Sequence, residues 1–143
     1  MPICYLGVGA NLGDRRQNIA LAVKRINQLL NTRIIRIAKI IETAPVGGPK
    51  GQPRFLNTVL KIKTKLEPEV LLSSLKRIER ELGRKKSALR YGPRLIDLDI
   101  LFYADRIVNS KNLKIPHPKI FQRDFVLRPL AELLDSGTQG RKF

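Results

Sequence analysis

Hydrophobic and polar residues follow two different periods along the first half of the chain. Residues 3–8 form an apolar run that predicts a buried strand. From Arg15 to Leu30 apolar residues recur every three or four positions, which predicts an amphipathic helix. Residues 33–41 are rich in isoleucine and favour a second strand. The chain is therefore expected to begin with a strand, a helix and a strand.

The second half is expected to have the same order of elements: a strand, a helix and a strand. Residues 55–63 alternate between two faces and predict a strand. A helix is expected to begin at Pro68, to bury the stripe Leu71, Leu75, Ile78 and Leu82, and to end at Gly83. Residues 95–103 alternate again and predict a central strand.

The order strand, helix, strand, strand, helix, strand is typical of the α+β ferredoxin-like βαββαβ sandwich, an antiparallel sheet covered by helices. The prolines and glycines of residues 44–53 predict a long loop before the third strand. The tail from Ile107 is expected to add loop and a short helix near residues 125–134. Without an internal repeat or a linker, residues 1–143 are expected to form a single domain.

Composition adds two expectations about surroundings and partners. Twenty-eight Lys and Arg against twelve Asp and Glu give a formal charge of +16, so an anionic partner is expected: a phosphate ligand, a nucleic acid or a membrane. The single cysteine, Cys4, is expected to be a buried packing residue. Because it has no partner for a disulfide, a reducing compartment is expected. No signal peptide and no membrane-spanning run is visible, so the expected location is cytoplasmic.

Asp97 and Asp99 are the candidate metal ligands. Two carboxylates at positions i and i+2 of a strand lie roughly 7 Å apart on one face. Such a pair could hold Mg²⁺ against a polyphosphate, because this ion prefers carboxylates, phosphate oxygens and water. Five cations precede or flank the pair: Arg84, Lys85, Lys86, Arg90 and Arg94. The alternative is that both aspartates form a solvated strand face.

Two further groups of residues could bind a ligand. His117 lies between two prolines, so its backbone is fixed; it is either a placed ligand or an ordinary packed or surface histidine. Phe55 and Asn57 share a strand face and could hold a flat heterocycle, with Phe125 on its other side; the alternative for each Phe is core packing. No P-loop or glycine-rich kinase loop is present in the sequence.

Taken together, these segments resemble the hydroxymethyl-dihydropterin pyrophosphokinase family over nearly the whole chain, from Tyr5 to Glu132. The most specific element is R-x-G-P-R-x-x-D-x-D at Arg90 to Asp99. The other matching motifs are Gly9-Ala10-Asn11-Leu12-Gly13-Asp14, Glu42-Thr43-Ala44-Pro45, Phe55-Leu56-Asn57, Ile115-Pro116-His117-Pro118 and Phe125-Val126-Leu127-Arg128-Pro129-Leu130.

The resemblance implies an ATP-dependent diphosphotransferase of folate biosynthesis. It would transfer the β,γ-pyrophosphate of ATP to the hydroxymethyl group of 6-hydroxymethyl-7,8-dihydropterin and release AMP. By matching position, Asp97 and Asp99 would ligate two Mg²⁺ ions. Arg84 and Arg94 would be catalytic arginines, and His117 and Arg123 would contact phosphates.

The resemblance also implies where the two substrates bind. The pterin would lie between Phe55 and Phe125, with Asn57 at its polar edge, and Tyr91 would cover the site. The backbone of Thr43 and Val46 would complete its recognition. Adenosine would lie near the matching positions Glu79, Arg90, Ile100 and Leu113.

Two other functional classes would leave different features in the sequence. A basic ferredoxin-like RNA-binding module would carry aromatic pairs in RNP-like motifs on its central strands, and none is found in the sequence. A non-catalytic relative would be expected to lose Asp97, Asp99 or Arg94, and all three are present. A monomer is the default expectation, with no membrane partner.

Overall fold

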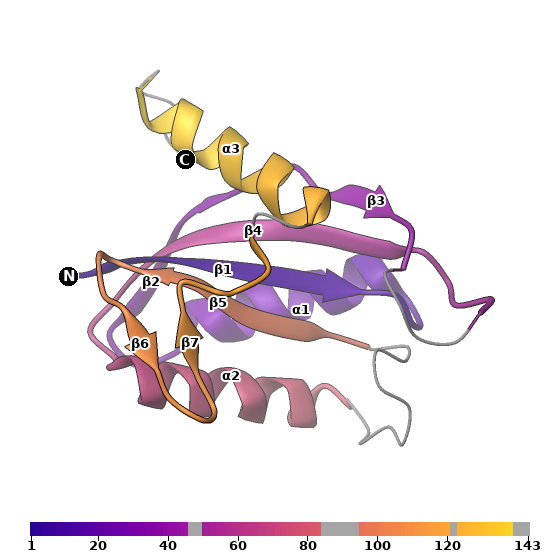
Figure 1. The fold of residues 1–143 in the computed structure, drawn as a ribbon. Helices are drawn as coiled ribbons and strands as arrows, with labels where there is room; N and C mark the ends of the chain where they lie inside the picture. The colour runs from indigo at the N-terminus through magenta and orange to yellow at the C-terminus, as the bar shows by residue number, and fades with distance from the viewer. Residues whose placement is uncertain (46–49, 84–94, 121–122, 139–143) are drawn as a thin grey trace.

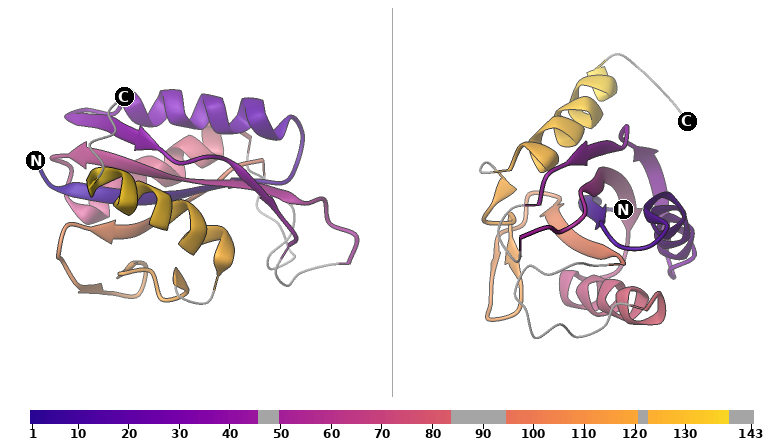
Figure 2. Two further views of the ribbon diagram at one scale, coloured as in Figure 1. Left: turned by 90° about the horizontal axis from the view of Figure 1, so that it is seen from above. Right: turned by 90° about the vertical axis from the view of Figure 1, so that its right-hand side faces the viewer.

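The computed structural model describes residues 1–45, 50–83, 95–120 and 123–138; at 124–125 and 135–138 it describes only the backbone. An antiparallel sheet forms the middle layer, with α1 and α2 on one face and α3 on the other (Figures 1 and 2). This arrangement is the predicted α+β ferredoxin-like class, with one helix added on the second face.

The sheet has the strand order β2-β4-β1-β5, and β3 also pairs with β4. All of these pairings are antiparallel. Its five strands are β1 (Ile3–Ala10), β2 (Thr32–Ile37), β3 (Ile41–Thr43), β4 (Phe55–Thr64) and β5 (Asp97–Tyr103). A separate hairpin joins β6 (Val108–Asn109) to β7 (Lys114–Ile115) and was not predicted from the sequence.

The main core lies between the sheet and the two predicted helices, α1 (Arg15–Asn27) and α2 (Pro68–Glu81). Asp14 begins α1, its carboxylate accepting a hydrogen bond from the Gln17 N–H at 3.1 Å. Pro68 and Gly83 bound α2 as predicted, Gly83 having a φ of 94°. Cys4 is buried in this core, as predicted, and burial raises the pKa of its thiol to about 12.

The second helix layer consists of α3 (Asp124–Thr138), which is longer than the predicted helix. It packs on β3 and β4 and encloses a smaller core that includes Val59, Leu101 and Leu130. No helix among the described residues is both long and apolar enough to cross a membrane.

The single strand predicted over residues 33–41 is wrong: the chain forms two strands, β2 and β3, along β4. Between the pairs Ile37–Leu60 and Ile41–Asn57 this segment has one residue more than β4. Thr58 accommodates the irregularity, because its hydroxyl donates a hydrogen bond to the Ala38 carbonyl at 2.7 Å. Such a bulge shifts the register and divides the strand.

The prediction that residues 95–103 form a central strand is also wrong. Within the described residues β5 pairs with β1 alone and lies at the edge of the sheet. Its alternation suggested a central strand because the same alternation occurs in central and edge strands, and α2 packs against one of its faces. Its outer edge is closed by other groups: Glu79 accepts the Leu98 N–H at 2.7 Å, and the His117 N–H donates to the Leu101 carbonyl at 3.0 Å.

Candidate active site

A row of residues across the sheet brings the candidate binding residues onto one face. Gly9 of β1 pairs with Asn57 of β4 on one side and with Asp97 of β5 on the other. Adjacent strands lie about 4.8 Å apart, so Asn57 and Asp97 are separated by about 10 Å across a glycine. The next row places Asp99 beside Gly7. Alternation therefore directs both aspartates, which were predicted to share a face, to the α3 face. Asn57 lies on the same face, which the sequence did not predict.

Asp97 and Asp99 form a half-buried pair of carboxylates. Burial and the negative charges of Asp97 and Glu79 together raise the pKa of Asp99 to about 7, although the positive charges of Lys76 and Arg123 lower it in part. Two anions held this close together in a partly closed site favour a cation between them. The residue chemistry fits Mg²⁺, the ion that the sequence predicted.

No cluster of three or more metal-binding side chains is found among the described residues. Within this part of the chain the aspartate pair therefore has no third carboxylate, histidine or cysteine ligand. A site with two carboxylates suits Mg²⁺ whose remaining ligands are water and phosphate oxygens, because this ion is usually bound together with its phosphate substrate.

His117 and Arg123 lie close to the aspartate pair. Burial lowers the pKa of His117, as does the positive charge of Arg123, whereas Asp97 raises it. The neutral ring accepts a hydrogen bond from the Lys119 N–H at Nδ1, 3.2 Å away. Nε2 therefore carries the proton and can donate a hydrogen bond to a phosphate oxygen. This geometry suits the predicted phosphate-contacting role.

Glu79 supports the strand that carries the aspartates. It is 1% exposed, and its Oε2 accepts the N–H of Leu98, the residue between Asp97 and Asp99. Its Oε1 lies 3.3 Å from Nζ of Lys76. Ile100, in the same strand, and Leu113 are buried in the main core. Their predicted contacts with adenosine, and that of Glu79, stay predictions.

The residues predicted to bind the pterin come together at the ends of β3 and β4. Thr43 pairs with Phe55, and Nδ2 of Asn57 donates a hydrogen bond to Oγ1 of Thr43 at 2.7 Å. Phe55 is half-buried and Asn57 is 7% exposed. The backbone of Phe125 lies in the first turn of α3, the helix that packs on β3 and β4.

The sequence reasoning gave no role to two residues of this region. Gly9 lies beside the Asn57 amide: Oδ1 of Asn57 is 2.8 Å from the position that a Cβ of residue 9 would occupy. Asn11 is 1% exposed and donates from Nδ2 to Oε1 of Gln52 at 3.1 Å and to the Pro53 carbonyl at 3.2 Å. It thereby ties the end of the long loop to β1. The signal available in the sequence was a polar residue, Asn11, soon after an apolar strand.

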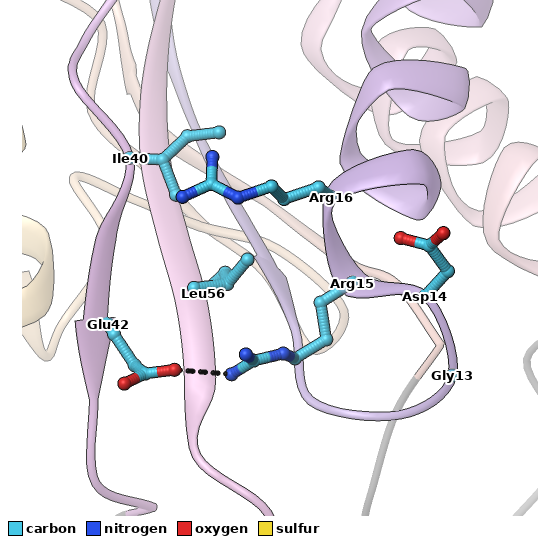
Figure 3. Close-up of a pocket in the computed structure, with 7 residues that line it drawn as sticks. All are labelled: Gly13, Asp14, Arg15, Arg16, Ile40, Glu42 and Leu56. Atoms are coloured by element: carbon cyan, nitrogen blue, oxygen red, sulfur yellow. Dashed lines mark hydrogen bonds and ion pairs between the residues drawn. The ribbon is translucent and has the colours of Figure 1, made fainter.

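A pocket of about 470 Å³ lies on the opposite face of β4, beside the N-terminus of α1 (Figure 3). Arg15 donates from Nη1 to Oε2 of Glu42 and to the Arg54 carbonyl, each at 2.9 Å. The hydrogen bond from Arg15 holds the pKa of Glu42 below its ordinary value. None of the predicted site residues lines this pocket; the lining residues are Gly13, Asp14, Arg15, Arg16, Ile40, Glu42 and Leu56.

Several predicted site residues lie outside the described part of the chain. They are Val46, Arg84, Arg90, Tyr91, Arg94 and the side chain of Phe125.

Comparison with known proteins supports the resemblance. Residues 5–135 match the family model described as 7,8-dihydro-6-hydroxymethylpterin-pyrophosphokinase. The chain is 43% identical over 133 residues to the 2-amino-4-hydroxy-6-hydroxymethyldihydropteridine pyrophosphokinase of Aquifex aeolicus, covering 93% of this chain and 81% of that protein. The Bacillus subtilis enzyme of the same name is 41% identical, with 92% and 77% covered.

Some relatives are longer proteins. A folate synthesis bifunctional protein of Arabidopsis thaliana is 45% identical over 129 residues, which is 90% of this chain and 26% of that protein. Among solved structures, a crystal structure of HPPK-DHPS in complex with substrates matches with a TM-score of 0.68 at 15% identity. The match covers 92% of this chain and 40% of that one, and at this identity it shows the fold alone.

Proposed function

Because the chain belongs to the 7,8-dihydro-6-hydroxymethylpterin-pyrophosphokinase family and so transfers pyrophosphate from ATP to hydroxymethyldihydropterin in folate biosynthesis, we propose that the row Asn57, Gly9 and Asp97 is its active-site floor. The observation that supports this proposal is the register, which sets the backbones of Asn57 and Asp97 about 10 Å apart, with both side chains on one face of the sheet. A flat ring bound at Asn57 can thus direct a substituent toward Asp97.

The proposed reaction is attack of the pterin hydroxyl oxygen on the β-phosphorus of ATP. A bond forms between that oxygen and the β-phosphorus, the bond from the β-phosphorus to the oxygen bridging it to the α-phosphorus breaks, and AMP leaves. The hydroxyl proton is released in the same step. An ordinary kinase attacks the γ-phosphorus and releases ADP, so the product nucleotide distinguishes the two reactions.

Asp97 and Asp99 would hold two Mg²⁺ ions. When bound, Mg²⁺ supplies positive charge to the phosphate oxygens and acidifies the attacking hydroxyl. The protein itself keeps the two carboxylates aligned on β5, with the Leu98 N–H between them fixed by Glu79. His117, through Nε2–H, and Arg123 would bind phosphate oxygens. Arg84 and Arg94 would neutralise charge on the transferred group.

The pterin would stack between Phe55 and Phe125, and Asn57 would form hydrogen bonds with its polar edge. The backbone of Thr43 and Val46 would add contacts, and Tyr91 would cover the ring. The adenosine would lie near the remaining matched positions, Glu79, Arg90, Ile100 and Leu113.

The decisive experiment resolves the nucleotides formed from Mg²⁺, ATP and 6-hydroxymethyl-7,8-dihydropterin. We expect AMP that depends on the pterin. ADP in its place would contradict attack at the β-phosphorus, and no nucleotide product from the folded protein would contradict the enzymatic role.

Asp97→Ala and Asp99→Ala test the metal assignment. Each variant is expected to abolish turnover, because the remaining carboxylate cannot hold both ions, and each is expected to keep the far-UV circular dichroism of the wild type. Asp105→Ala is the matched control, since Asp105 is an exposed aspartate just after the same strand. Near-normal turnover in either of the first two variants would refute the two-metal assignment.

We also propose that the protein acts as a monomer in the cytoplasm. The buried Cys4 thiol, which forms no disulfide, suits a reducing compartment. At the outer edge of β5 the Leu98 N–H and the Leu101 carbonyl are bonded within the chain, which disfavours strand pairing with a second copy. Light scattering at several concentrations tests the monomer, which predicts a constant mass near 16.3 kDa.

A further inference from the structure

The Asn57 side chain is restrained on both sides. It lies in β4 between Gly9 of β1 and Ile41 of β3. On the β3 side, Nδ2 donates to the Thr43 hydroxyl at 2.7 Å. On the β1 side, Oδ1 lies 2.8 Å from where a Cβ at residue 9 would be, closer than real Cβ contacts come. The amide therefore extends over the backbone of β1, in space that only glycine leaves open.

Glycine at position 9 is needed for this space and not for its backbone conformation. Gly9 is absent from the glycines with positive φ among the described residues, which are Gly13, Gly51 and Gly83. Gly7, two residues earlier on the same strand and face, differs: a Cβ there would lie 3.5 Å from Cδ2 of Leu101, an ordinary van der Waals contact. An added methyl group would thus disturb Asn57 from position 9 and would fit at position 7.

Building on the proposed function, we propose that Gly9 and the Thr43 hydroxyl are positioning residues that hold the Asn57 amide where it meets the polar edge of the pterin. With one N–H committed to Thr43, the amide offers its second N–H and its oxygen to a ligand. Without the Thr43 hydroxyl the amide loses this hydrogen bond and can turn away from its position beside Gly9. A ring edge of fixed donor and acceptor pattern would then lose these partners.

Thr43→Val and Thr43→Ser test the hydroxyl. Valine keeps the shape and removes the hydrogen-bonding group, whereas serine keeps the group. Pterin binding is measured by isothermal titration calorimetry in the presence of Mg²⁺ and a non-hydrolysable ATP analogue. We expect Thr43→Val to weaken pterin binding about tenfold, Thr43→Ser to stay within about threefold of the wild type, and the affinity for the analogue to stay unchanged. Wild-type affinity in Thr43→Val, or equal losses in both variants, would overturn the inference.

Gly9→Ala and Gly7→Ala test the space beneath the amide. Gly9→Ala should weaken pterin binding about tenfold or more, while Gly7→Ala should bind as the wild type does. Circular dichroism and thermal melting verify that both variants fold. Equal pterin affinities for the two variants would contradict a specific role of Gly9. If Gly9→Ala does not fold, the Thr43 pair alone decides the inference.

A double-mutant cycle separates positioning from direct contact. If Thr43 acts through Asn57, adding Thr43→Val to Asn57→Ala should change pterin affinity by less than about twofold. A full additional loss would show that the Thr43 hydroxyl binds the pterin by itself and would overturn the inference. The wild type distinguishes the two levels of the argument: absence of pterin binding and of AMP formation there refutes the proposed function, whereas an active wild type with unaffected variants refutes only the positioning.

Discussion

At the scale of single residues, the site brings together groups that repel each other when no cation is bound. Asp99 has a pKa near 7 because it is desolvated and lies beside Asp97. A carboxyl group whose pKa is raised by folding favours the folded state only while it is protonated. Its contribution is fully present below the unfolded pKa, about 3.8, and is lost as the pH rises through about 7. The site is thus kept ready for a cation at a cost in stability.

We predict that Asp99→Asn stabilises the metal-free protein at pH 8 and does so much less at pH 5. The expected change in the relative free energy of unfolding between these two values is about 2–3 kcal/mol, since each pKa unit corresponds to about 1.4 kcal/mol. Urea denaturation in EDTA measures it, with Asp105→Asn as the exposed control. Parallel pH profiles for the wild type and Asp99→Asn would contradict the prediction.

The sequence was sufficient to pair Asp97 with Asp99 and Phe55 with Asn57, because strand alternation decides which side chains of a strand share a face. Thr43 was named only through the family resemblance. The sequence did not reveal the function of Gly9. It shows only that residue 9 has no side chain. The structure shows that Oδ1 of Asn57, on the neighbouring strand, occupies the space where a Cβ would lie.

At the scale of elements, the strongest sequence signals were those with local causes. The α2 helix begins at Pro68 and ends at Glu81, just before Gly83, because fixed φ and positive φ are properties of proline and glycine. The edge position of β5 could not be predicted, because its alternation is the same in a central strand. What closes its outer edge is the Glu79 carboxylate and the segment at His117, which are distant in sequence.

Gly83→Ala is predicted to lower the free energy of unfolding by about 1–3 kcal/mol, from the positive φ and from crowding. A Cβ there would lie 3.0 Å from Cδ1 of Leu95. Gly51→Ala is the matched control, because Gly51 also has a positive φ, 79°, but no atom within 4 Å of a Cβ. Denaturant titration should show the smaller loss for Gly51→Ala; equal losses would show that crowding contributes nothing.

At the scale of the whole molecule, the formal charge of +16 exceeds what one nucleotide needs. Such a net charge attracts anionic ligands over distances of the order of the Debye length, about 10 Å at 0.1 M salt. The pterin substrate is uncharged and should not experience this attraction. The positive charge of the protein should therefore speed the binding of ATP and have little effect on the binding of the pterin.

Raising the KCl concentration from about 20 mM to about 300 mM is predicted to lower kcat/KM for ATP severalfold and to leave kcat/KM for the pterin nearly unchanged, because screening removes only the attraction of the anion. Steady-state kinetics with each substrate varied in turn measures this. Equal salt effects on both parameters would contradict electrostatic attraction and would indicate a general effect of salt on the enzyme.

The closure of β5 by Glu79 and by the His117 segment has a consequence for self-association. Exposed strand edges are the places where copies of a protein join into aggregates. The strand that carries Asp97 and Asp99 is poorly suited to pair with another copy, because its Leu98 N–H and Leu101 carbonyl already form hydrogen bonds within the chain. At the opposite edge, β2 has a bulge and the exposed cation Arg33. The strand that carries the two aspartates can therefore lie at the edge of the sheet without promoting aggregation through that edge.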